Sequence, residues 1–188
     1  NYNDTLLKVY LGNTYNVGDT FVVRVAYHGI PQTDPSGFGG FSFSSGYAYN
    51  LGVGFSADPH VYGRTWHPCF DNFVERCKYE FYITTNDTKM AVCNGLLIDS
   101  TINTINATRL WHWKLDEEIP SYLAGIAVSN YVLVKKNLNG IIGNTDALIA
   151  CAVADTNKVH GSFAHLQQSF TMLEDHFGQY QWPRVGYS

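Results

Sequence analysis

Residues 75–94 read ERCKYEFYITTNDTKMAVCN, and this stretch sets the structural class expected for the chain. Apolar or small side chains alternate with charged ones along its first half: Cys77, Tyr79, Phe81 and Ile83 against Lys78 and Glu80. An alternation of period two is typical of a β-strand with one buried face. A polar turn at 85–87 precedes a second apolar run. The stretch therefore predicts a β-hairpin with strands at 75–84 and 89–94.

Further segments carry strand patterns. Thr20–His28 alternates regularly, 105–115 and 125–134 alternate imperfectly, and 147–154 is apolar on both faces, as in a central strand. Residues 35–55 combine glycines with aromatic residues, which predicts an ordered loop with short strands. Strands separated by turn signals favour a sandwich or a curved sheet, so we expect a mainly β fold.

The pattern changes near Lys158. Apolar residues then recur at helical spacing: Phe163, Leu166, Phe170, Leu173 and Phe177. Gly178 and Pro183 follow, as is typical beyond the end of a helix. We therefore expect one C-terminal amphipathic helix. The chain divides into a β domain at 1–157 and a helix with its following loop at 158–188.

Composition narrows the function classes. Charged residues make up 15% of the 188 residues, and 12 Lys+Arg against 16 Asp+Glu give a net charge of -4. This balance argues against nucleic-acid binding, which usually requires a basic surface. No apolar run approaches the roughly 20 residues of a membrane-spanning helix, so we expect no membrane span. The low lysine content and the Asn- and Tyr-rich loops favour a secreted or periplasmic protein, with a cytoplasmic location as the alternative.

The cysteines and histidines suggest no obvious active site. The four cysteines form no CxxC pair, so a structural zinc site is poorly supported. The predicted hairpin would place Cys93 opposite Cys77, and either a disulfide between them or two free thiols fits this pattern. The seven histidines are dispersed, and no nucleophile or phosphate-binding motif occurs. On its own residues, the chain carries no complete catalytic or metal site.

The segment richest in candidate functional residues is 58–73, DPHVYGRTWHPCFDNF. The simplest interpretation is a structural loop in which Arg64 pairs with Asp71 and the aromatic residues fill a core. Residues 64–71 also resemble the Arg-x-x-Phe-Pro-Cys-Phe-Asp signature of the aminopeptidase N and leukotriene hydrolase family, the gluzincin zinc aminopeptidases. His67 takes the place of the usual Phe in that signature.

Four more segments resemble the same family in the same order: Tyr27–Gly29, Ala91–Gly95, Pro120–Leu123 and Phe177–Tyr187. The resemblance implies a curved, saddle-like N-terminal β domain at 1–157, whose first strands precede this sequence. The opening helix and loop of a catalytic domain would follow at 158–188. The parent would be a zinc metallopeptidase that removes N-terminal residues from peptides. The family's His-Glu-x-x-His and Gly-x-Met-Glu-Asn motifs do not occur, so we expect no catalytic residue, metal or cofactor in this chain.

The resemblance also assigns roles and partners. Family members bind the amino terminus of the substrate through a residue that precedes the signature, and Asp58 or His60 would take that role here. The structural motif would consist of Arg64, Pro68, Cys69 and Asp71. The expected partners are a peptide substrate of the parent and the catalytic domain of the same polypeptide. We also expect self-association through an open sheet edge.

Two other functions stay open. The high aromatic content and the pair Trp111 and Trp113 would suit a β-sandwich binding module, for a glycan or a protein, in which exposed rings stack on the ligand. A family member that has lost its active site and serves as a scaffold would show the same sequence features.

Overall fold

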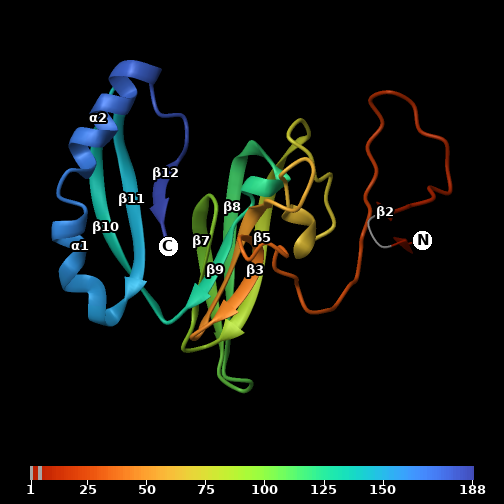
Figure 1. Cartoon of the computed structure of the whole chain (residues 1–188), viewed down its shortest axis with the longest axis horizontal. Helices are drawn as coiled ribbons and strands as arrows, with labels where there is room; N and C mark the ends of the chain where they lie inside the picture. The colour runs from red at the N-terminus through yellow and green to blue at the C-terminus, as the bar shows by residue number, and fades with distance from the viewer. Residues whose placement is uncertain (1, 4–5) are drawn as a thin grey trace.

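The structure is a computed structural model, and it describes residues 2–3 and 6–188. Figure 1 shows an irregular N-terminal arm, a central β body and a C-terminal hairpin covered by helices. The arm contains β1 (Tyr2–Asn3) paired with β2 (Leu6–Leu7). Among the described residues, no helix is both long enough and apolar enough to cross a bilayer.

The first large sheet has the antiparallel strand order β5-β8-β7. Its strands are β5 (Arg76–Asn86), β7 (Leu96–Asn103) and β8 (Thr108–Pro120). The alternation along β8, the central strand, puts Trp111 and Trp113 on the buried face. Phe81 of β5 lies directly opposite Trp113, so neighbouring strands contribute aromatic rings to one apolar layer.

The second sheet has the strand order β3-β4-β9-β6. Its strands are β3 (Gly39–Ser44), β4 (Tyr47–Gly54), β9 (Ile126–Ser129) and β6 (Met90–Cys93). The register of β3 shifts between Gly39 and Gly40. A Cβ on Gly40, whose φ is 79°, would lie 2.5 Å from the Gln32 oxygen, so a larger residue does not fit there.

One hydrophobic core joins these two sheets, and it also receives residues from the hairpin that follows. Trp113 is completely buried, and its Nε1 donates to the Ala91 oxygen at 2.9 Å, which ties β8 to β6. Trp111 donates to Thr85 Oγ1 at 3.0 Å within its own sheet. Both indoles therefore bury their rings and satisfy their polar atom, which fixes how the sheets pack.

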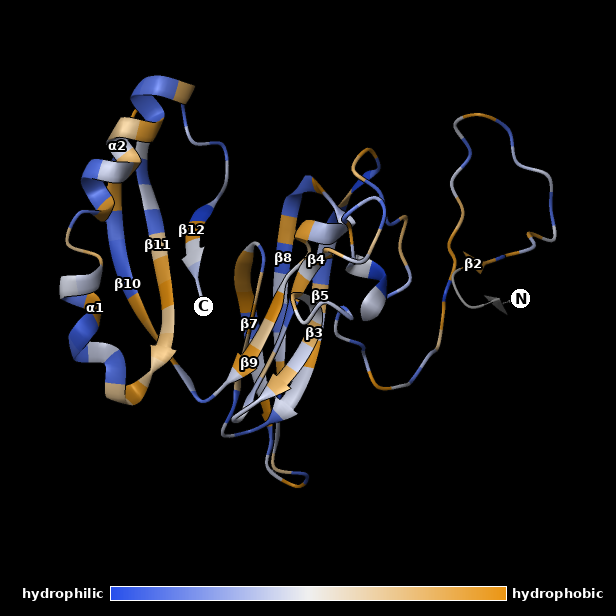
Figure 2. Ribbon diagram, viewed as in Figure 1, coloured by the Kyte–Doolittle hydropathy of each residue, from blue (hydrophilic) through white to orange (hydrophobic). Residues whose placement is uncertain are grey.

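The C-terminal part is a second layered unit. β10 (Tyr131–Gly140) and β11 (Gly143–Ala152) form a hairpin, and β12 (Arg184–Tyr187) pairs parallel to β11. The helices α1 (Thr156–Ser162) and α2 (Leu166–Phe177) lie between β11 and β12 in the sequence, as a parallel connection requires. Figure 2 shows α2 banded in hydrophobic and hydrophilic colours. Short 3-10 turns are η1 (Gly63–Thr65), η2 (Ser121–Leu123) and η3 (Val153–Asp155).

The predicted fold, mainly β with a C-terminal amphipathic helix, is confirmed. The helix is shorter than its pattern predicted, because α1 and α2 separate at 163–165 and Phe163 lies in the break. The predicted boundary between 157 and 158 falls inside α1. The division into a β domain and the opening of a catalytic domain stays a prediction.

Both strands predicted in 75–94 are present, as β5 and β6, but their pairing as a hairpin is wrong. β5 and β6 belong to different sheets, because the turn after β5 carries the chain across the core instead of back along the same sheet. Cys77 therefore lies opposite Ile119, and Cys93 lies opposite Ile126. All four cysteines are free thiols, so of the two alternatives for Cys77 and Cys93 the structure has the free thiols.

The predicted strand Thr20–His28 is not formed. Among the residues that the structure describes, this segment belongs to no sheet, and its apolar side chains are exposed. Alternation makes a segment competent for a sheet, but a strand also needs a neighbour to complete its hydrogen bonds.

Candidate functional site

The signature segment 64–71 forms a hydrogen-bonded loop around Asp71. Arg64 Nη1 lies 2.5 Å from Asp71 Oδ2, which confirms the predicted ion pair. Asp71 Oδ1 accepts from the Gly63 backbone N–H at 3.0 Å and from Ser121 Oγ at 3.2 Å. The Phe70 oxygen lies 3.0 Å from Ser121 Oγ, so the single hydroxyl proton of Ser121 is shared between the Phe70 oxygen and Asp71 Oδ1. Asp71 thereby joins the loop to η2, which is a structural role.

His67 and Cys69 of this segment are half-buried. The ring of His67 packs on Trp66, with the centroids 4.4 Å apart, and meets Tyr79 edge-on at 6.1 Å. Both ring nitrogens are buried and have no hydrogen-bond partner within 2–3 and 6–188, and burial lowers the pKa of His67. Burial also raises the pKa of Cys69 to about 11, with Asp71 adding to the shift. A neutral ring and a protonated thiol at neutral pH fit packing roles.

The loop before the signature presents Asp58 and His60 at the surface. Ser56, at its start, donates its backbone N–H to Asp34 Oδ2 at 3.1 Å, and Val61, at its end, is completely buried. Both Asp58 and His60 are exposed, and the Asp58–Pro59 peptide is cis. His60 Nδ1 lies 3.2 Å from the Gly54 oxygen, whereas Asp58 makes no hydrogen bond or ion pair with the described residues.

Asp34 holds the start of this loop from within the fold. Its side chain is almost completely buried and accepts hydrogen bonds from Ser36 and from Ser56. Burial alone would raise the pKa of Asp34, but these hydrogen bonds outweigh it and lower the pKa. The loop that carries Asp58 and His60 is therefore fixed by an ionised carboxylate.

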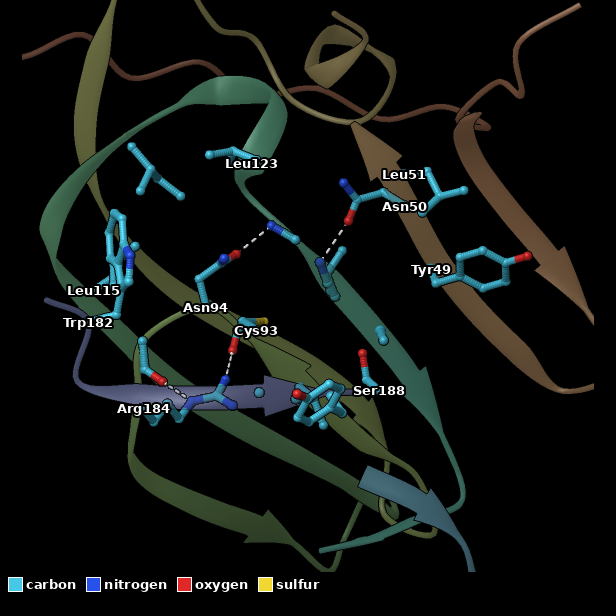
Figure 3. A pocket seen from close by; sticks show the side chains of 18 of the residues that line it. Tyr49, Asn50, Leu51, Cys93, Asn94, Leu115, Leu123, Trp182, Arg184 and Ser188 are labelled. Carbon is cyan, nitrogen blue, oxygen red and sulfur yellow. Dashed lines mark hydrogen bonds between the residues drawn. The ribbon is translucent and has the colours of Figure 1, made fainter. Parts of the chain in front are cut away.

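A cavity of about 640 Å³ lies elsewhere, between the second sheet and the C-terminal segment 180–188. Figure 3 shows its lining, which is largely apolar and aromatic and includes Tyr49 and Trp182. Asn50 Oδ1 accepts from the Ile126 N–H at 2.6 Å, and Asn94 Oδ1 accepts from the Gly125 N–H at 2.5 Å. These two amides fix the start of β9 in the cavity wall.

Arg184 lines the cavity on the side of β12. It donates through Nε to the Gly95 oxygen and through Nη2 to the Cys93 oxygen, and its guanidinium lies 5.0 Å from the ring centre of Trp113. Burial lowers the pKa of Arg184. Burial also raises the pKa of Cys93 to about 12, so this thiol stays neutral. The lining is suited to enclosing an apolar group, and it aligns no nucleophile with a base.

The structure does not bring the predicted substrate residues into this cavity, because neither Asp58 nor His60 lines it. Sequence reasoning missed Asn50, Asn94 and Arg184 as cavity residues. Asn94 and Arg184 lie in segments that resemble the family, but their contacts reach across 31 and 91 residues. No local pattern reveals such distances.

Two function classes can be tested on the described residues. Within 2–3 and 6–188, no group of three or more His, Cys, Asp or Glu side chains is placed to hold a metal ion, so these residues do not fit the family's zinc. Trp111 and Trp113 are 3% and 0% exposed. They cannot act as exposed platforms for a glycan, so that interpretation of the two tryptophans is wrong.

No family model and no curated protein matches this sequence. Solved structures do match. M1 zinc metallopeptidase from Deinococcus radiodurans matches with a TM-score of 0.70 and 18% identity, over 84% of this chain and 36% of that chain. A mutant of that enzyme bound to a Tyr-Ser-Ala substrate matches with a TM-score of 0.67 and 20% identity, over 84% of this chain and 36% of the mutant's chain.

Legionella pneumophila aminopeptidase A, in complex with aspartic acid, matches with a TM-score of 0.67 and 16% identity, over 84% of this chain and 18% of that one. The present chain thus spans about a third of the Deinococcus enzyme and less of the Legionella enzyme. The chain has the fold of the N-terminal domain of M1 zinc aminopeptidases, the family that its sequence resembles.

Proposed function

We propose that this chain is the non-catalytic β domain of a zinc-dependent metallo-aminopeptidase and that it forms a wall of the substrate cleft. The observation that carries the proposal is the fold, which matches M1 zinc metallopeptidases over 84% of this chain and about a third of theirs. The rest of such a polypeptide would supply the catalytic domain, which is then the main partner of this chain.

The contribution of this chain would be to bind and orient the peptide. The described residues do not fit a metal, so the zinc ligands would come from the catalytic domain. The chain instead offers a fixed loop whose exposed residues include a carboxylate. We propose that the chain carries a substrate-binding residue and that the catalytic residues lie in the catalytic domain.

Asp58 is the residue that we assign to the amino terminus of the substrate. Its carboxylate is exposed, lacks a partner among the described residues, and lies on a loop held at Ser56 and Val61. A peptide's protonated amino group is a suitable partner for such a carboxylate, because charge-assisted hydrogen bonds are the strong ones. His60 lies beside Phe55, with the ring centroids 6.4 Å apart, and would line the same site.

The test is steady-state kinetics of the parent enzyme on an aminoacyl-arylamide. Asp58→Asn should raise KM by about tenfold or more, since a hydrogen bond to a charged group contributes about 1.5–3 kcal/mol. Asp87→Asn is the matched control, because Asp87 is also exposed but lies in the turn after β5. An unchanged KM in Asp58→Asn would remove Asp58 from the site. If the parent protein showed no hydrolytic activity, the function as an inactive scaffold would be the remaining interpretation.

A secreted or periplasmic location is part of this proposal and rests on the composition alone. Signal in the extracellular or periplasmic fraction after cell fractionation would support it, and signal confined to the cytoplasmic fraction would contradict it.

A further inference from the structure

The segment Thr20–His28 of the N-terminal arm has the sequence of a strand but pairs with no strand among the described residues. Along Thr20–His28, Phe21, Val23 and Val25 are 47%, 44% and 38% exposed, although their alternation is typical of a half-buried face. Val22, on the other face, is 90% exposed. A run of exposed apolar residues of this length is unusual on a free surface and indicates an interaction site.

The arm leaves the body beside β5. The Tyr27 hydroxyl donates to the Trp66 oxygen at 3.0 Å, and the Trp66 ring stacks against Phe81 of β5 at 6.4 Å. Beyond this point the arm runs away from the central body, as the red and orange trace in Figure 1 shows. The strand-like segment is therefore attached to the body through Trp66, which contacts β5, and extends outward from there.

β5 is an edge strand with a free side. It pairs only with β8 among the described residues, so one side of Arg76–Asn86 has no strand neighbour. An open edge of this length is a template for another strand. The edge of β3 is less open, because Phe41 donates to the Gln32 oxygen and Thr33 forms a bridge with Gly40. The edge of β7 lies on the far side of β8 from β5.

We propose that Thr20–His28 of one copy adds as a strand to the free edge of β5 in a second copy. The nine-residue segment fits within the eleven residues of β5. Phe21, Val23 and Val25 then extend the apolar face that carries Phe81. The exchange is reciprocal, so each copy supplies one arm and one edge. A two-fold symmetric dimer with both β5 edges covered results.

The test combines sedimentation velocity with hydrogen exchange on the full chain, from about 1 µM to about 200 µM, where mass action favours association. A dimer should form as the concentration rises, and the β5 amides should exchange more slowly in step with it. Val23→Lys should weaken association by at least roughly tenfold. Val22→Lys, on the opposite face, is the matched control and should leave association unchanged. Circular dichroism verifies that both variants are folded.

Each of several results would overturn the proposal. A monomer at every concentration excludes the dimer. Protection of β5 that does not change with concentration indicates that the arm folds back on its own chain. Concentration-dependent protection at β7 instead of β5, or equal weakening by Val22→Lys, places the interface elsewhere. The proposal is independent of the aminopeptidase assignment, because it concerns only the arm and β5.

Discussion

The hydrogen bond from Trp113 to Ala91 makes the packing of the two sheets testable with a matched pair of substitutions. Trp113→Phe and Trp111→Phe make the same chemical change in two indoles that are both almost completely buried. They differ in the acceptor that is left behind. Trp113→Phe removes the donor to the oxygen of Ala91, a completely buried residue. Trp111→Phe removes the donor to Thr85 Oγ1, which belongs to a half-buried residue.

The two variants should differ in their free energy of unfolding. Each substitution removes packing contacts worth about 1–2 kcal/mol, which is more than the loss of one methyl group costs and less than the truncation of a whole aromatic side chain costs. An acceptor left unpaired in the core costs about 1–3 kcal/mol in addition. Thr85 Oγ1 escapes most of this cost, because it already donates to the Lys89 oxygen at 2.9 Å and can reach water. We therefore expect Trp113→Phe to be more destabilising than Trp111→Phe by about 1–2 kcal/mol.

Urea unfolding followed by circular dichroism measures this difference. With a slope of about 2 kcal/mol per molar urea, the midpoint of Trp113→Phe should lie about 0.5–1 M below that of Trp111→Phe. Equal midpoints, or a lower midpoint for Trp111→Phe, would refute the inference that the Trp113–Ala91 bond ties the sheets together.

Three further predictions concern other parts of the chain. Burial lowers the pKa of His67, so the unfolded state binds the proton of this ring more readily than the folded state does. The contribution of neutral His67 to the free energy of unfolding is therefore fully present above the ordinary pKa of 6.5 and is lost as the pH falls through the lowered pKa. His67→Phe should therefore reduce the loss of urea midpoint between about pH 7 and about pH 5, and an unchanged loss would exclude His67 as its source. Glu174→Ala leaves the backbone N–H groups of Ile141 and Tyr180 unpaired and should lower stability by about 2–4 kcal/mol, whereas Glu174→Gln should cost less, as urea unfolding will show. Native Cys77 should react with a thiol reagent, whereas Cys93, whose pKa is raised to about 12, should react only after unfolding; a Cys77–Cys93 disulfide in the mass spectrum would contradict the structure.

The sequence predicted which segments can form strands better than it predicted their partners. Alternation in 75–84 identified the strand, because side-chain direction is a local property. Its partner β8 begins 22 residues after β5 ends, and no local signal favours that strand over β6. The same limit explains Thr20–His28, where the pattern describes a surface suited to a sheet and the neighbour decides whether a strand forms.

The same limit applies to the candidate site: contacts within one segment could be predicted, and contacts between distant segments could not. The pair Arg64 and Asp71 could be predicted, because the two residues lie seven positions apart in one recognisable segment. The cavity could not, because Arg184 reaches backbone oxygens of residues 91 and 89 positions earlier. The exposed position of Asp58 depends on Asp34, a buried residue whose sequence context resembles an ordinary turn.

The most direct test of the central claim compares two proteins: this chain alone and the full product of the reading frame that encodes it. Each is purified, its bound zinc is measured by mass spectrometry, and its hydrolysis of an aminoacyl-arylamide is followed with and without a chelator. We predict stoichiometric zinc and chelator-sensitive hydrolysis in the full product, and neither in this chain alone. Zinc-dependent hydrolysis by this chain alone, or a full product that neither binds zinc nor cleaves the substrate, would contradict it.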